Sequence, residues 1–86
     1  MEENTTKILT ATIQTKKRNK VWRTIENKSI DMLKLWLLQN CKGNQRGFIA
    51  ESIVDGDSGF VLAKKMLFCV EGNNSFPKVI YDENNQ

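Results

Sequence analysis

Two alternating segments near the start of the chain predict a β-hairpin. In residues 7–15 (KILTATIQT) and 21–27 (VWRTIEN), apolar and polar side chains alternate, as they do along a strand with one buried face. The apolar positions of one face are Leu9, Ala11, Ile13, Val21 and Ile25. Residues 16–20 (KKRNK) interrupt the pattern, and Asn19 tolerates the left-handed conformation that a tight turn uses. The predicted hairpin therefore has a strongly basic tip.

In the next segment the apolar residues have helical spacing, which predicts one helix over about residues 30–42. Ser29 is a good N-cap, and Asp31 places negative charge in the positive first turn. Gly43 is suited to end the helix. Apolar residues occupy so much of this helix that we expect it to be covered on more than one side, by the sheet and by a second chain.

The remainder of the chain has strand composition again. Residues 48–54 alternate, and residues 60–70 are long and apolar, with two lysines in the middle. The second segment is either one long bent strand or two strands. Residues 55–59 (DGDSG) are typical of a turn and pair 48–54 with 60–66 as a hairpin. Residues 78–82 predict a last strand at a sheet edge, because Pro77 precedes them.

The order β-β-α-β-β-(β) predicts an α+β fold: a mainly antiparallel sheet with the helix packed on one face. The chain has 86 residues, so we expect one domain spanning 1–86. Residues 1–5 and 82–86 are polar, and we expect both ends to fray.

Charge is distributed unevenly along the chain. The net charge is +3, from 13 Lys and Arg against 10 Asp and Glu. Residues 1–50 hold ten of the basic and four of the acidic residues, whereas residues 51–86 hold three and six, so the halves carry +6 and −3. This asymmetry favours an acidic partner for the first half.

The basic run is the first candidate site, for nucleic acid or another acidic partner. Its residues are Lys16, Lys17, Arg18, Lys20, Trp22 and Arg23. The cations would attract phosphates, and Trp22 would stack on an exposed base. The alternative is a solvated hairpin tip that protects the sheet edge, with Trp22 in the core.

The second candidate is a protein interface formed by Leu35, Trp36 and Leu38 on the helix. The alternative is that these side chains belong to the core. An apolar surface on the strand 60–70 is the other source of binding energy that we consider.

The stretch Gly56-Asp57-Ser58-Gly59 matches the residues around the nucleophile of chymotrypsin-like serine proteases. That chemistry needs a base, and the chain has no histidine. Asp55 and Asp57 have the spacing that begins a calcium loop, but the later ligand positions hold Gly59 and Met66. We therefore interpret the stretch as a turn and expect neither a catalytic nor a metal site.

Other compositional features point to an intracellular binding protein. Cys41 and Cys69 lie in apolar segments without CxxC spacing, as free buried thiols of a cytoplasmic protein do. No segment has the length or pattern of a membrane span or signal peptide. Nine Asn and ten Lys are in keeping with an AT-rich coding sequence, as in many phages.

We therefore predict a small non-enzymatic interaction protein of the accessory or inhibitor type, of phage or mobile-element origin. It would dock on a protein partner or dimerise, and would use no cofactor, small-molecule substrate or membrane. The alternative is a nucleic-acid-binding protein that uses the basic hairpin 16–23.

Overall fold

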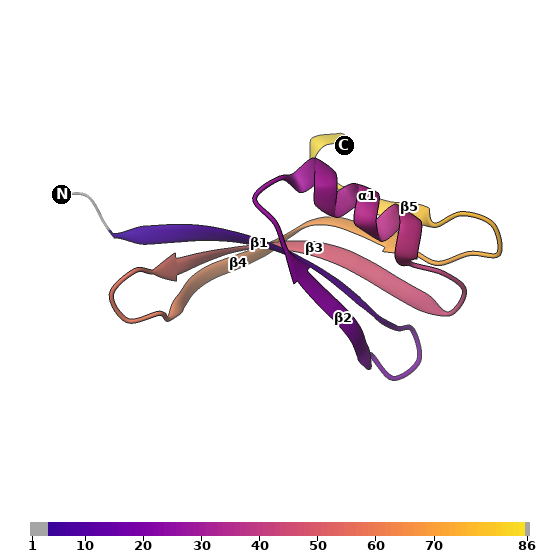
Figure 1. Cartoon of the computed structure of the whole chain (residues 1–86), viewed down its shortest axis with the longest axis horizontal. Helices are drawn as coiled ribbons and strands as arrows, with labels where there is room; N and C mark the ends of the chain where they lie inside the picture. Colours follow the sequence, from indigo (N-terminus) through magenta and orange to yellow (C-terminus); the bar gives the residue numbers. More distant parts are fainter. Residues whose placement is uncertain (1–3, 86) are drawn as a thin grey trace.

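Five antiparallel strands form one sheet in the computed structural model, which describes residues 4–85 (Figure 1). The elements are β1 (Thr5–Thr15), β2 (Val21–Glu26), α1 (Ile30–Asn40), β3 (Gln45–Asp55), β4 (Val61–Glu71), β5 (Lys78–Asp82) and the short 3-10 helix η1 (Glu83–Asn85). The strand order is β2-β1-β3-β4-β5. The α+β fold and the predicted element order are confirmed, including the fifth strand at the edge.

The core lies between α1 and one face of the sheet. Leu33 and Leu37 of the helix are fully buried. They belong to one cluster with Cys41 and with the strand residues Ala11, Ile13, Ile49, Leu67, Phe68 and Val70. Every strand residue in this cluster comes from the second half of β1, the first half of β3 or the second half of β4. The helix therefore covers one end of the sheet.

The predicted start of the helix is confirmed, whereas its predicted end is two residues late. Ser29 is the N-cap, and its Oγ accepts a hydrogen bond from the Met32 N–H at 3.3 Å. The helix ends at Asn40, because Cys41 already has extended backbone angles. Gly43 has a φ of 57° and lies in the turn that leads into β3, where the Gln45 N–H bonds the Lys42 carbonyl.

Within residues 4–85 the sheet covers one side of α1, and the expected cover by a second chain stays a prediction. The sheet covers the side that carries Leu33 and Leu37, while Met32 is 54% exposed and Leu35 is 47% exposed. The side of the helix that carries Met32 and Leu35 has no covering element among residues 4–85.

Residues 60–70 form one bent strand rather than two. In the β3–β4 register, Ile49 pairs with Phe68 and Ala50 with Met66, so Leu67 is an extra residue that forms a bulge. A second register shift near the tip leaves Leu62 as the extra residue. Bulges bend a strand and increase its twist, and this lets a long strand follow the sheet.

The helix is too short to cover the sheet. Its eleven residues span about 16 Å, whereas β1, β3 and β4, also of eleven residues each, span about 36 Å. The molecule measures 50 × 27 × 19 Å. Three strand segments and the turn 56–60 therefore extend beyond the helix (Figure 1). We call these parts together the arm; they are the segments Thr5–Leu9, Glu51–Asp55 and Val61–Met66 and the turn 56–60.

The ends that we expected to fray belong partly to regular elements. Thr5 begins β1, Asp82 ends β5, and the chain continues into η1. Residues 1–3 and 86 lie outside the described residues.

Candidate interaction surfaces

The tip of the β1–β2 hairpin carries the predicted basic run. The Thr15 N–H bonds the Lys20 carbonyl at 2.9 Å, and Asn19 adopts the left-handed conformation with a φ of 52°. Lys17, Arg18 and Lys20 are exposed at this tip. Local turn chemistry thus gathers three cations within four residues, in full contact with solvent.

Lys16 differs from the other basic residues of the run. Its Nζ donates a hydrogen bond to the Gly72 carbonyl at 3.1 Å, and its backbone N–H bonds the Asn44 carbonyl at 2.8 Å. This lysine joins the hairpin to two other loops. Its charge faces the interior of the molecule more than the exposed tip.

Trp22 lies on the surface and not in the core. In the β1–β2 register Gln14 pairs with Val21 and Ile13 pairs with Arg23, so Trp22 is the extra residue of a bulge. Its side chain is 53% exposed. It lines a pocket of about 310 Å³ with Thr15, Lys20, Val21 and Gln45. An aromatic and a basic residue therefore line the same hollow.

The three helix residues predicted as an interface have different environments. Leu35 is exposed, whereas Trp36 and Leu38 are partly buried and pack against the core cluster. Asn40 anchors this side by donating from its Nδ2 to the Trp36 carbonyl at 2.8 Å. Only Leu35 and the neighbouring Met32 present large apolar side chains on this side of the helix.

The arm exposes more apolar surface than the helix does. Four large apolar residues at the end of the turn and in the first half of β4 have exposed fractions from 45 to 73%. They are Phe60, Val61, Leu62 and Met66, and we call them the arm patch. On the sheet face opposite the helix, Val61 pairs with Val54 and Met66 with Ala50. On this face the patch therefore has two parts, Val61 beside Val54 and Met66 beside Ala50, with the Lys64–Ser52 pair between them.

The stretch 55–59 forms the turn that the sequence predicts. The Ser58 hydroxyl donates to Asp55 Oδ2 at 2.9 Å, and the Asp57 N–H donates to Asp55 Oδ1 at 3.1 Å. Gly59 has a φ of 80°, and its N–H bonds the Asp55 carbonyl. The Asp57 backbone N–H and then the Ser58 hydroxyl lower the pKa of the Asp55 carboxyl. Ser58 thus stabilises a carboxylate within its own turn.

The two cysteines lie at the end of α1 and in β4, and neither forms a disulfide. Cys41 is buried and Cys69 partly buried, and both are free. Burial raises the pKa of each thiol, which keeps the sulfur protonated and unreactive.

Over residues 4–85, three or more His, Cys, Asp or Glu side chains are nowhere grouped so that they could hold a metal ion. Within the same range, no helix has the length and apolar character needed to cross a membrane. No protein-family model, curated protein or solved structure matches the chain. Its function must be inferred from its own surface.

The sequence contains a signal for the arm patch that periodicity does not reveal. A helix of about 30–42 reaches roughly 20 Å, whereas a bent strand over 60–70 reaches about 36 Å. Comparing these lengths shows that part of the long apolar segment has no helix over it. Periodicity alone assigns every apolar residue of such a strand to a core.

Proposed function

We propose that this chain is a non-enzymatic module that binds a partner protein through the arm patch. The observation that carries the proposal is the exposure of Phe60, Val61, Leu62 and Met66 on a part of the sheet that the helix does not reach. Large exposed apolar side chains grouped on one part of a surface are typical of docking sites, since their transfer out of water drives association.

The shape of the arm supports this proposal. It is one sheet layer thick, so a partner can contact Val61 and Met66 from the face opposite the helix without any rearrangement of the core. The exposed cations of the hairpin tip lie at the other end of the molecule and would steer an acidic partner during approach. The two free thiols favour a cytoplasmic location for the module.

The test compares two variants that remove similar apolar surface from different places. Met66 and Leu35 have nearly equal exposed fractions, 45 and 47%. Val61→Thr with Met66→Gln removes the centre of the arm patch, whereas Leu35→Gln with Met32→Gln changes the helix. Both variants should stay within about 1 kcal/mol of the parent in unfolding free energy, because all four side chains are exposed.

The expected result is that the parent chain and the helix variant capture the same protein in quantitative affinity purification, while the arm variant does not. The solution mass of each variant identifies the case in which the captured partner is a second copy. Equal capture by the arm variant would overturn the proposal. Loss of capture with the helix variant alone would move the interface to Leu35 and its neighbours.

A second candidate function is nucleic-acid binding by the hairpin tip, and the exposure of Trp22 beside Lys20 favours it. An exposed indole with neighbouring cations is a combination that proteins use to bind single-stranded nucleic acid.

Charge removal at Lys17, Arg18 and Lys20 should reduce the logarithmic salt slope of oligonucleotide binding by about two. The matched control removes three lysines elsewhere, at Lys28, Lys64 and Lys78. Absence of binding at low salt would contradict this candidate.

A further inference from the structure

The first half of β1 is a sheet edge without a neighbouring strand among residues 4–85. β2 pairs with β1 only from Thr10 to Gln14, because the chain turns away toward α1 after Glu26. The last backbone bond on this side of β1 joins the Asn27 N–H to the Leu9 carbonyl at 3.2 Å. Beyond it, β1 continues through Thr5 beside β3 alone. We call the space beside Thr5–Leu9, where no strand follows β2, the gap.

The backbone groups that face this gap follow from the register. In an antiparallel sheet, successive residues direct their N–H and C=O groups to opposite neighbours. Leu9 bonds toward the β2 side, and Asn4 bonds toward β3, since its carbonyl accepts from the Gly56 N–H at 2.7 Å. Thr5 and Lys7 therefore direct their backbone groups into the gap, which offers the hydrogen-bonding pattern of a missing strand.

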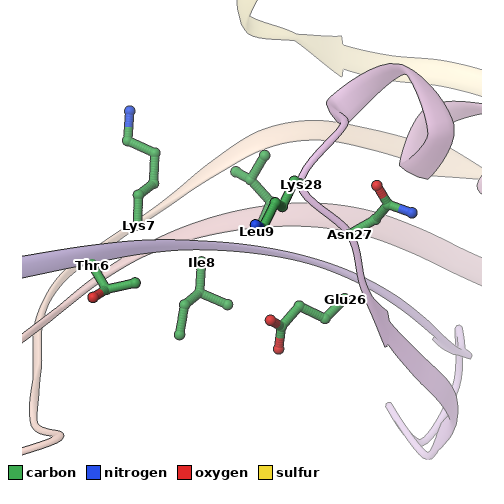
Figure 2. A pocket seen from close by; sticks show the side chains of 7 residues that line it. All are labelled: Thr6, Lys7, Ile8, Leu9, Glu26, Asn27 and Lys28. Atoms are coloured by element: carbon green, nitrogen blue, oxygen red, sulfur yellow. The ribbon is translucent and has the colours of Figure 1, made fainter. Parts of the chain in front are cut away.

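A pocket occupies the gap (Figure 2). Its volume is about 320 Å³. The lining residues are Thr6, Lys7, Ile8, Leu9, Glu26, Asn27 and Lys28. Figure 2 shows Lys7 on the helix side of β1, and Thr6 and Ile8 on the opposite side. The two sides of the gap therefore differ in chemistry: Lys7 and Lys28 make the helix side cationic, whereas Thr6 and Ile8 line the other side, with the Glu26 carboxylate at the end of β2.

The other free edge of the arm is irregular, whereas this one is regular. Along Val61–Met66, β4 has no strand beyond it, because β5 pairs only with Phe68–Glu71. This edge carries the Leu62 bulge and two lysines, and Lys65 is tied to Glu83 of η1 at 2.8 Å. Both edges carry lysines, which oppose strand addition, but only the β4 edge also has a bulge. In contrast, β1 pairs with β3 without a register shift over Thr5–Thr15.

We propose that the free edge of β1 at Thr5–Ile8 binds an extended segment of a partner protein by β-strand addition. The added strand would occupy the column of β2 and bond the backbone of Thr5 and Lys7. This inference rests on the proposed function as a protein-binding module, and it adds a second contact at the edge of the arm.

Charge defines the chemistry of the added strand. Lys7 and Lys28 line the gap on the helix side, and the Lys7 ammonium is 3.5 Å from Glu51 with 61% of its side chain exposed. A residue opposite Lys7 is therefore favoured when it is Asp or Glu, and the residues on either side of it are favoured when apolar, because they face Thr6 and Ile8. A second copy of this chain suits the gap less well, since antiparallel self-pairing brings the two Lys7 ammonium groups to directly opposite or diagonal positions.

Two blocked five-residue peptides test the inference, Thr-Val-Glu-Val-Thr and its counterpart with Lys in place of Glu. Amide NMR titration of the full chain should show shifts confined to β1 and the pocket, with slower hydrogen exchange at the Lys7 N–H. We expect the Lys peptide to bind about threefold to fivefold more weakly. Lys7→Glu should invert this preference, which a general loss of structure would not do.

Lys7→Pro removes the backbone donor while keeping an edge position that proline tolerates, and it should weaken binding about tenfold. Lys7→Gln is the matched control, because it removes the charge and keeps the N–H. Equal binding of both peptides, unchanged binding by Lys7→Pro, shifts located elsewhere, or no binding at millimolar peptide would each overturn the inference. A concentration-dependent dimer that Lys7→Pro abolishes would assign the edge to self-association instead.

The arm variant with Val61→Thr and Met66→Gln separates this inference from the proposed function. If it still binds the acidic peptide but no longer captures the partner, both stand. If the peptide fails to bind while the arm variant loses the partner, only the edge inference fails. If the peptide binds but the arm variant captures the partner normally, only the proposed function of the arm patch fails.

Discussion

Lys16 Nζ donates a hydrogen bond to the carbonyl oxygen of Gly72 across 3.1 Å, although 56 positions separate the two residues. The bond is partly buried, and it connects the hairpin tip to the loop between β4 and β5. One of the five cations in the basic run thus has a structural partner. Its neighbour Lys17 is exposed.

Adjacent lysines should therefore differ in their effect on stability. Lys16→Met leaves the Gly72 carbonyl without this charged donor and should lower the unfolding free energy by about 1 kcal/mol. Lys17→Met should change it by less than about 0.5 kcal/mol, as exposed substitutions usually do. Urea denaturation followed by far-UV circular dichroism measures both. Equal losses for the two variants would show that the bond contributes nothing specific.

Gly72 should tolerate no side chain. A Cβ atom there would lie 2.6 Å from the Lys42 carbonyl carbon and 2.8 Å from backbone atoms of Gly43. Because backbone atoms cannot rotate away, we expect Gly72→Ala to cost about 1–3 kcal/mol. Gly59→Asn is the control: its site is open and asparagine accepts positive φ, so it should cost about 1 kcal/mol or less. Thermal unfolding of both variants decides whether the close approach matters.

Acid should weaken the turn through Asp55. Hydrogen bonds from the Asp57 N–H and the Ser58 hydroxyl lower its pKa, so the carboxylate stabilises the folded state above the pKa of the unfolded chain. That contribution is lost as the pH falls through the lowered folded-state pKa. Ser58→Ala should raise the Asp55 pKa toward its ordinary value, as carboxyl carbon NMR titration would show. Ser75→Ala, in another loop, should leave this pKa unchanged.

The two thiols should react slowly in the folded protein. Burial raises the pKa of both Cys41 and Cys69, so little thiolate is present near neutral pH. Ellman's reagent should modify both rapidly only after denaturation. A thiol introduced at the exposed position by Ser75→Cys supplies the fast reference. Rapid modification of Cys41 in the native state would contradict the packing described for the helix end.

Local interactions explain the parts of the fold that could be predicted. Most bonds within the turn at 55–59 join residues at most five positions apart, with Asn4 as the distant partner, and the Ser29 cap acts on Met32. Residue type is informative for such contacts, because the partners are fixed by the short chain between them. The same holds for the turn at Asn19.

The candidate surfaces depend on distant contacts, and periodicity could not rank them. Trp22 is exposed because a bulge in the β1–β2 pairing makes it the extra residue. Trp36 is partly covered because it packs against the core cluster, while Leu35 on the same helix is not. The spacing of apolar residues in the sequence is the same whether or not another element packs on their side chains.

The order of the elements along the chain, the two hairpins and the role of residues 55–59 follow from the sequence alone, because alternation, capping and turn chemistry act over a few residues. Tertiary contacts decided that β1 pairs with β3 and which end of the sheet the helix covers. Only the tertiary structure decided which apolar residues stay in water. The helix covers one end of strands about twice its length. The pairing of β2 with β1 stops at Thr10, so Thr5–Leu9 lie beyond it. These mismatches leave Val61, Met66 and the edge at Lys7 without a covering element among residues 4–85.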